Sequence, residues 1–482
     1  MNKTIELSHE VAGNKVKATL GKHILADGFD FVMDYEKSHG SWIHDRLTGT
    51  EFLDMFSMFG SASVGYNHPY IVGKSSWLGK MAVYKPTMSD VYLQEYADFV
   101  ETFSRVAIPE ELPYCFFVEG GALAVENALK TAFDWKTRKN WLKGSKTEGS
   151  VAIHFKQAFH GRSGYTLSLT NTNDPRKYQY FPLFDWPRII NPKLYFPITE
   201  ENLQETIKNE QLALLQIEEA ILSNQDKAAC IIIETIQAEG GDNHFRDEFL
   251  VELRRICDEN EMLLIFDEVQ TGIGITGKMW AFQNYSVVPD VISFGKKAQV
   301  CGILASKTKL DEVERHVFAE SSRINSTFGG NFIDMLRFQL VLEIIEKENL
   351  LENVINILWH AGEPTVMPIE FYKEVTNIFD RKIPKNIKIR QQIQTNGTLI
   401  NQNWCNFFKE SKMEVGISLD GPKHINDQNR LSRTGKSTFE DTMNGINLLK
   451  ENNIPFSVIS VLTDYSLDFA EEIYNFFKNL DV

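Results

Sequence analysis

The chain has 482 residues, of which 43% are hydrophobic and 24% charged, and its formal net charge is -15. This length and composition predict two to four ordinary globular domains. The negative charge argues against a nucleic-acid partner, because neutralising phosphates requires a basic surface. No apolar run reaches the roughly 18 residues of a membrane span, and residues 1–6 do not begin a signal peptide. We therefore expect no membrane partner.

Cysteine usage indicates a reducing compartment. The five cysteines are odd in number and far apart in the sequence: Cys115, Cys230, Cys257, Cys301 and Cys405. Few, scattered cysteines in an acidic chain are typical of reduced thiols rather than of disulfides. We therefore expect a cytoplasmic protein.

Short apolar runs alternate with helical patterns over the first three-quarters of the chain. Candidate buried strands cover residues 115–118, 151–155, 230–233, 263–266 and 291–294. Between the third and the fourth run, residues 247–260 have the apolar stripe of an amphipathic helix. This alternation predicts an α/β sandwich with a mostly parallel sheet. Because ligands bind beyond the carboxyl ends of the strands in such sheets, the residues after each run are candidates for a site.

A glycine turn follows the first run. Gly120, Gly121 and Ala122 lead into a helix, and such a turn lets the free amides and the positive dipole end of a helix approach a phosphate. Taken alone, a Gly-Gly turn before a helix is more often only a turn.

An aromatic ring and a cation follow the second run. Phe159 could stack on a planar cofactor, and Arg162 could hold a carboxylate through two hydrogen bonds. His160 lies between them. A core phenylalanine beside a solvated arginine is an equally good interpretation of this stretch by itself.

Acidic residues follow the third and fourth runs. Glu234 and Glu239 come after the third, where a buried carboxylate is costly without a partner; surface carboxylates are the alternative. Asp267 comes directly after the fourth and should be desolvated. A carboxylate there would be stable opposite a cation such as a protonated pyridine nitrogen.

Two adjacent lysines, Lys296 and Lys297, follow the fifth run. A lysine at the mouth of a buried strand can have a lowered pKa and form an imine, although such a pair is usually a solvated surface feature. Together, the five positions have the order that an enzyme using pyridoxal 5'-phosphate (PLP) needs. They supply a phosphate cradle, a ring stacker, a pyridinium partner and a Schiff-base lysine.

Residues from about 20 to 354 resemble a class III aminotransferase of the fold-type I PLP family, and they are similar to the L-lysine 6-transaminase subtype. The stretches that carry the resemblance are residues 120–130, 266–272, 294–302 and 325–331. The resemblance implies an N-terminal segment in residues 1–60 and a PLP-binding large domain, an α/β/α sandwich, in residues 61–354.

The resemblance also implies roles for residues at the cofactor. It places the imine on Lys296, leaves Lys297 outside the chemistry and pairs Asp267 with the pyridine nitrogen. The remaining cofactor contacts that it implies are Gly121 and Ala122 at the phosphate, Phe159 on the ring with His160 beside it, Gln270 near the ring oxygen, and Thr327 at the phosphate of a neighbouring subunit. The last contact implies a homodimer with shared sites.

The implied reaction is a ping-pong transfer of the ε-amino group of L-lysine to 2-oxoglutarate. It yields glutamate and a semialdehyde that cyclises. By the same resemblance, Arg162 and Gln270 contact substrate, and Glu239 is a switch carboxylate that covers a second arginine while lysine is bound. Ornithine or another ω-amine is the alternative donor. We expect no metal site.

The composition changes near Val354 without a linker. Residues 355–482 contain 15 asparagines in 128 positions, against 18 in the preceding 354, and carry 14 basic and 16 acidic residues. This shift indicates two segments of different origin.

Residues 355–482 resemble a fragment of a radical S-adenosylmethionine (SAM) enzyme of the SPASM type. Residues 357–364, 394–399 and 416–422 carry the resemblance, which implies a partial β/α barrel and places Glu363, Ser418 and Arg430 at SAM. Radical SAM chemistry requires three closely spaced cysteines to hold a [4Fe–4S] cluster, and only Cys405 lies in this segment. We therefore predict that the segment is catalytically inert.

Three functions remain as hypotheses. The first is a PLP aminotransferase that acts on lysine. The second is a PLP-binding protein impaired in catalysis, because the resemblance stops before the family's small C-terminal domain, which supplies a second carboxylate-binding arginine. The third is a radical SAM enzyme, which the cysteine count disfavours.

Overall fold

The computed structural model describes residues 11–351, 353–360, 362–383, 387–432 and 434–480. Residues 1–6, in which we looked for a signal peptide, and Ala361 of the first SAM-like stretch lie outside these ranges. The chain forms two compact units, residues 1–351 and 352–482. Within the described ranges, every helix is too short or too polar to cross a bilayer.

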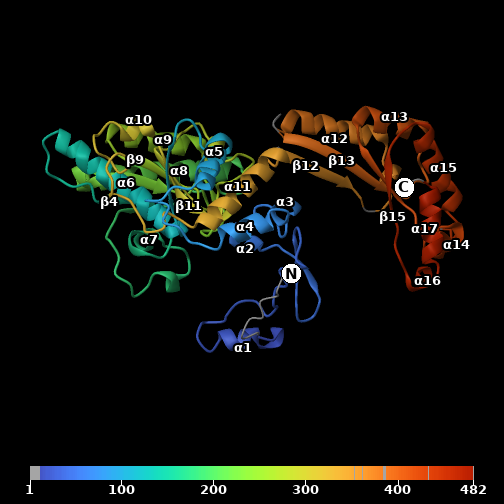
Figure 1. The fold of residues 1–482 in the computed structure, drawn as a ribbon. Helices are drawn as coiled ribbons and strands as arrows, with labels where there is room; N and C mark the ends of the chain where they lie inside the picture. The colour runs from blue at the N-terminus through green and yellow to red at the C-terminus, as the bar shows by residue number, and fades with distance from the viewer. Residues whose placement is uncertain (1–10, 352, 361, 384–386, 433, 481–482) are drawn as a thin grey trace. The chain divides into compact units, whose positions relative to one another are not determined.

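A seven-stranded sheet organises the first unit (Figure 1), in the order β3-β11-β10-β9-β6-β4-β5. Its strands are β3 Tyr114–Val118, β4 Val151–Phe155, β5 Arg188–Ile189, β6 Ala228–Ile233, β9 Leu263–Asp267, β10 Val291–Phe294 and β11 Cys301–Ala305. The pairs from β10 to β5 are parallel, whereas β11 runs antiparallel to both β10 and β3. This sheet confirms the predicted fold class. It also brings the carboxyl ends of all the strands except β11 to one edge.

The five predicted strands are all present in this sheet, and its two other strands were missed. β5 has only two residues. β11 contains Gly302, which weakens a strand pattern because glycine has no side chain to pack. A Cβ at Gly302 would lie 2.2 Å from the Phe116 carbonyl oxygen of β3, so this close approach of two strands requires glycine.

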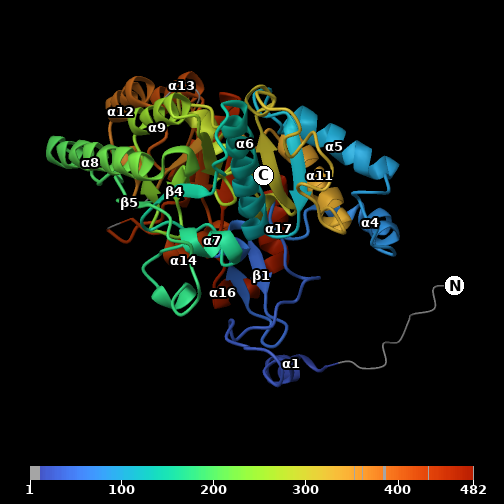
Figure 2. The ribbon, with the colours of Figure 1, turned by 90° about the vertical axis from the view of Figure 1, so that its left-hand side faces the viewer.

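Helices cover both faces of the sheet, because successive residues of a buried strand point to opposite sides. Leu264 and Phe266 of β9 join one core, while Leu263 and Ile265 join the other. The first core is covered by α5 Gln94–Val106, α8 Glu200–Asn224, α9 Asp247–Glu259 and α11 Phe332–Lys347. On the other side, the 22-residue helix α6 Gly121–Leu142 crosses the sheet (Figure 2). α9 confirms the helix predicted over residues 247–260.

Shorter elements complete the first unit. They are α1 Val16–Leu20, β1 Trp42–His44, β2 Glu51–Leu53, α2 Ser57–Gly60, α3 Pro69–Val72, α4 Ser75–Met81, α7 Gly164–Leu169, β7 Ile236–Gln237, β8 Asn243–His244 and α10 Lys307–Leu310. β1 pairs with β2, and β7 with β8, in two small antiparallel sheets.

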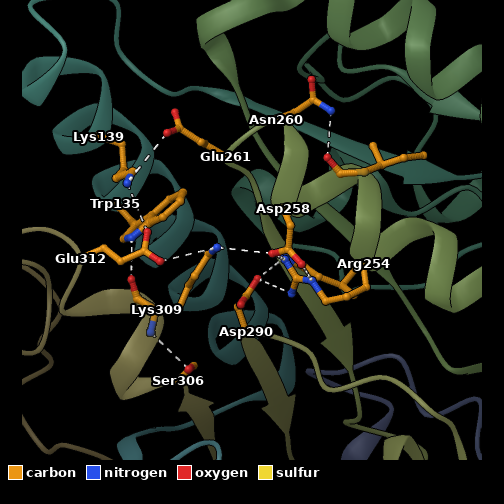
Figure 3. A network of polar contacts seen from close by, with 12 residues as sticks. Trp135, Lys139, Arg254, Asp258, Asn260, Glu261, Asp290, Ser306, Lys309 and Glu312 are labelled. Atoms are coloured by element: carbon orange, nitrogen blue, oxygen red, sulfur yellow. Dashed lines mark hydrogen bonds and ion pairs between the residues drawn. The ribbon is translucent and has the colours of Figure 1, made fainter.

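A polar network ties the helices to the amino ends of the strands, opposite the carboxyl edge (Figure 3). Asp290, just before β10, accepts a hydrogen bond from the Leu264 amide at 2.7 Å and pairs with Arg254 of α9 at 2.7 Å. Trp135 of α6 donates from Nε1 to the Lys309 carbonyl at 2.9 Å, and the Lys309 ammonium lies 5.5 Å from the Trp135 ring centre. The network therefore connects α6, α9 and α10 to the sheet.

The second unit is built on a four-stranded parallel sheet in the order β12-β13-β14-β15. Its strands are β12 Asn353–Trp359, β13 Ile387–Thr395, β14 Glu414–Ser418 and β15 Phe456–Ile459. Its helices are α12 Ile369–Lys382, α13 Gln402–Ser411, α14 Lys423–Asn429, α15 Phe439–Glu451, α16 Asp464–Leu467 and α17 Ala470–Asn479. Strand and helix alternate in chain order, as in the β/α pattern that was predicted for this segment.

Candidate active site

A cavity of about 390 Å³ lies at the carboxyl edge of the first unit's sheet. Its volume is within the range of small-molecule sites. Eight of the ten predicted site residues line it: Gly121, Ala122, Phe159, His160, Arg162, Asp267, Gln270 and Lys296. Four further wall residues were not among the predicted ones: Gly161, Ser163, Glu234 and Val269. The parallel sheet brings these residues together from the ends of five strands.

The start of α6 forms one end of the cavity. Gly120 precedes the helix with φ 97°, and no side chain caps the helix. The first helical bond runs from the Ala124 amide to the Gly120 carbonyl at 3.0 Å, so the three preceding amides have no helical acceptor. These amides and the positive end of the helix dipole favour an anion such as a phosphate.

Asp267, at the end of β9, is held by three hydrogen bonds. Its Oδ1 accepts from the Ser293 hydroxyl at 2.9 Å and from the Val269 amide at 3.1 Å. Its Oδ2 lies 2.8 Å from His160 Nδ1. An ionised carboxylate only accepts hydrogen bonds, so Nδ1 carries the hydrogen of this pair. The buried Asp267 carboxylate is therefore fixed in one orientation.

Lys296 follows β10 in a tight turn, with φ 50°. Its Nζ donates to Gln270 Oε1 at 2.5 Å and to the Phe59 carbonyl at 3.1 Å. Burial lowers the pKa of Lys296, although nearby carboxylates, Glu239 first among them, oppose the shift. A lowered pKa increases the fraction of neutral amine, which is the nucleophilic form.

Glu234 is a carboxylate of the cavity wall that was not among the predicted site residues. It directly follows β6, is 5% exposed and accepts a hydrogen bond from the Phe159 amide at 3.2 Å. Burial raises the pKa of Glu234 well above its usual range, and the nearby Asp267 raises it further. Its position after β6 matches that of Asp267 relative to β9, and this signal in the sequence could have identified it.

Two predicted residues lie outside the cavity wall. Glu239 forms an ion pair with Lys177, whose ammonium lies 5.6 Å from the Phe159 ring centre, so Glu239 is close to the cavity without lining it. Thr327 is exposed. Arg162 does line the cavity, and its exposed guanidinium has no ion-pair partner among the residues that the structure describes.

Residues 25–359 match the family model for aminotransferase class-III. The chain belongs to the class III aminotransferases. This aminotransferase is 48% identical over 343 residues to the L-lysine-epsilon aminotransferase of Amycolatopsis lactamdurans, covering 70% of this chain and 76% of that protein. It is 32% identical over 374 residues to the 4-aminobutyrate aminotransferase of Emericella nidulans, covering 72% of this chain and 73% of the relative.

A solved structure resembles the first unit of the aminotransferase as well. It is the lysine aminotransferase from M. tuberculosis in the internal aldimine form, which is 48% identical to this chain. The superposition has a TM-score of 0.69 and covers 71% of this chain and 78% of that one. The fold and the family thus agree with those expected from the ordered strand-end motifs.

Residues 325–477 match the family model of the radical SAM superfamily. The three residues that the resemblance places at SAM form hydrogen bonds or an ion pair within the second unit. The Glu363 carboxylate accepts hydrogen bonds from the Thr395 hydroxyl at 2.5 Å and from the Asn396 amide at 2.8 Å. Arg430 lies 2.7 Å from the Asp420 carboxylate. Ser418 accepts a hydrogen bond from the Gln394 amide group at 3.0 Å.

The second unit does not suit an iron–sulfur cluster. Cys405 is fully buried in the apolar core on α13. Among the described residues, no group of three histidine, cysteine or acidic side chains could hold a metal. A [4Fe–4S] cluster requires cysteine thiolates at close spacing, so the residues present do not fit this cofactor.

Proposed function

We propose that the chain transfers the ε-amino group of L-lysine to 2-oxoglutarate with PLP as cofactor, giving glutamate and a semialdehyde that cyclises. The observation that carries this proposal is that Lys296, Asp267 and the uncapped start of α6 share one cavity. The lysine aminotransferases among the relatives support lysine as the donor. We assign the chemistry to a large domain in residues 61–354, with residues 1–60 as its N-terminal segment and residues 355–482 as a partial barrel.

The cavity residues fit PLP in chemistry and position. Lys296 would bind it covalently, Asp267 would face its pyridine nitrogen and the amides at Gly121 and Ala122 would bind its phosphate. Phe159, with His160 beside it, would cover the ring, and Gln270 would lie near the ring oxygen. When bound, PLP supplies a ring that accepts the electrons left on the substrate carbon after proton removal.

The protein's own groups would hold and move protons. The Asp267 carboxylate, fixed by three hydrogen bonds, would keep a proton on the pyridine nitrogen. Lys296, with its lowered pKa, would take the proton from the substrate carbon that bears the amine and would deliver it to the carbon that receives the amino group. Gln270 accepts a hydrogen bond from the Lys296 amine and would orient it.

Two charged residues would select the substrates. The exposed Arg162 guanidinium would bind a substrate carboxylate through two parallel hydrogen bonds. Glu239 would act as the switch carboxylate, and its ion pair with Lys177 shows that it can pair with a cation beside Phe159.

Removal of the Lys296 amine tests the proposal. The purified protein should bind PLP with a visible absorption band and convert 2-oxoglutarate to glutamate only when lysine is present. In Lys296→Ala the band should disappear and turnover should fall by about 10³-fold or more, because both the covalent link and the base are lost. Parallel assays with ornithine and 4-aminobutyrate would define the donor.

A catalytically impaired PLP-binding protein is the second candidate. The observation that favours it is that the matched region covers 76% of the lysine aminotransferase relatives rather than their full length. Bound PLP without turnover on any amine donor would select this candidate and contradict the active enzyme.

We also propose a homodimer in which Thr327 of one subunit reaches the cofactor phosphate of the other. Support comes from its exposure and its position outside the cavity of its own subunit. Mixing inactive Lys296→Ala with a weakened Thr327→Val variant should restore turnover, because one site of a mixed dimer then has both residues. No gain on mixing would contradict shared sites.

A further inference from the structure

Three side chains of the loop that carries Lys296 donate hydrogen bonds to backbone carbonyl groups of the N-terminal segment. Lys296 Nζ donates to the Phe59 carbonyl at 3.1 Å, Lys297 Nζ to the Gly60 carbonyl at 3.4 Å and Gln299 Nε2 to the Ser61 carbonyl at 3.1 Å. Three side chains of one loop therefore bind three consecutive carbonyl groups of a segment that lies 237 or 238 positions earlier in the sequence. We call residues 57–61 the carbonyl strap.

The carbonyl strap has an unfavourable backbone conformation. Ser57, Met58, Phe59 and Gly60 have φ values of 51°, 50°, 58° and 75°. Consecutive left-handed residues are sterically costly for L-amino acids other than glycine. Such a turn persists only where its surroundings hold it, and the bonds from the lysine loop are contacts of this kind.

Lys297 connects the strap to a third segment. Its Nζ donates to the Gln270 carbonyl at 2.6 Å as well as to Gly60, and the residue is only 5% exposed. The side chain of Gln270 in turn holds the Lys296 amine at 2.5 Å. Lys297 thus joins the loop after β9, the loop after β10 and the carbonyl strap, all of which border the Lys296 amine.

The three ties differ in what happens to them during turnover. On the proposed function, the Lys296 amine must leave Phe59 whenever it binds the cofactor or moves a proton. Lys297 does not line the cavity, so its two carbonyl bonds need not change. A buried ammonium held by carbonyl groups is costly unless these bonds are made, which keeps the two segments next to each other.

We propose that Lys297 is a positioning residue that holds the carbonyl strap and Gln270 in place around the reactive amine of Lys296. This inference rests on the proposed function for its kinetic consequence, but its structural consequence can be measured without cofactor. The matched control is Lys278→Met, because Lys278 is an exposed lysine in the same unit.

The test compares Lys297→Met with Lys278→Met and the unmodified protein. First, amide hydrogen exchange of the cofactor-free proteins is measured over residues 55–63. Among the three proteins, exchange should rise only in Lys297→Met, because the strap loses one of its three side-chain anchors. Second, the visible PLP band, KM and kcat are measured for the donor. In Lys297→Met the band and KM should stay close to those of the unmodified protein while kcat falls by about tenfold or more, because the Lys296 amine is misplaced.

Each outcome decides the proposal. Unchanged exchange in the strap, or a kcat within about twofold of the unmodified enzyme, would overturn it. If the PLP band weakened and KM rose together with the fall in kcat, the role of Lys297 would be merely structural. This result would also overturn the proposal. If Lys297→Met does not fold, Lys297→Gln, which keeps a shorter amide donor, is measured in the same way and should give an intermediate effect.

An unmodified protein without turnover refutes the proposed function, and the exchange result still decides the role of Lys297 in holding the strap.

Discussion

At the scale of single residues, the candidate site depends on groups that can adopt only one orientation. Asp267 accepts from three donors on three different segments, His160, Ser293 and Val269. His160 is itself buried, and its Nε2 has no hydrogen-bond partner among the described residues.

Asp267→Asn tests the role of this carboxylate. The amide is nearly isosteric, but it cannot hold a proton on a pyridine nitrogen, so kcat should fall by about 10²-fold or more. Ser293→Ala is the control, because it removes one of three hydrogen bonds and should cost about tenfold or less. Steady-state kinetics with lysine measures both. Equal losses in the two variants would contradict the assigned role.

Glu234 should make stability depend on pH. Burial raises its pKa in the folded protein, so the unfolded chain loses this proton at lower pH than the folded protein does. The contribution of Glu234 to the free energy of unfolding is therefore fully present below the pKa that Glu234 has in the unfolded chain. It is lost as the pH rises toward the raised pKa of the folded protein. Glu234→Gln does not titrate.

Hydrogen exchange of β6 in the cofactor-free protein provides the measurement. Between about pH 5 and about pH 8, the opening free energy of the unmodified protein should decrease relative to that of Glu234→Gln. A constant difference between the two proteins across this range would show that Glu234 titrates normally.

At the scale of elements, α6 both presents its amino end to the cavity and anchors the far edge of the sheet. Gly121 lies at the amino end of this helix and Trp135 lies further along it. Trp135 is fully buried, and its ring has the ammonium groups of Lys139 and Lys309 at 5.6 and 5.5 Å from its centre. We therefore expect the position of the amino end of α6 to depend on the packing of Trp135 further along the helix.

Trp135→Ala should destabilise the first unit by about 3–5 kcal/mol, because it removes a large buried ring and the hydrogen bond to the Lys309 carbonyl. Trp141→Ala, on the same helix, removes a ring that is 55% exposed and should cost less than about 1 kcal/mol. The free energy of unfolding in denaturant and the amide hydrogen exchange of α6 are measured for both variants. Similar losses would show that the network at Trp135 does not hold the helix.

At the scale of the whole molecule, the chain combines two units that differ in the polar side chains available to bind a ligand. The first contains a cavity lined by the Lys296 amine, the Asp267 carboxylate and the uncapped amino end of α6. The second has the strand order of a β/α barrel fragment, but its polar side chains at the strand ends bind one another. Glu363 and Asp420 are both engaged with neighbouring backbone and side-chain groups.

The second unit should not carry out radical SAM chemistry. After anaerobic treatment with iron and sulfide, the protein should show no [4Fe–4S] absorption, because Cys405 is buried and lacks partner cysteines. Reductive cleavage of SAM should also stay at the level of a protein-free control. Formation of a redox-active cluster would overturn this prediction and require ligands that the cysteine spacing does not supply.

Much of the first unit was predictable because its signals are local. A run of four or five apolar residues identifies each long central strand, and the residue after it must lie at the carboxyl edge of a parallel sheet. Asp267 and Lys296 were placed in this way. β11 was missed because Gly302, which its close contact with β3 requires, also weakens the strand pattern.

The sequence by itself determined the fold class, the family and most of the residues that line the cavity, because these depend on the order of short motifs along the chain. Only the tertiary structure decided which carboxylates reach the cavity and which groups hold Lys296. Glu234 rather than Glu239 lines the wall, since Glu234 directly follows β6. Lys297 and Gly60 are 237 positions apart, and no local pattern predicts their contact. That contact arises because the folded chain buries the second lysine among backbone carbonyl groups.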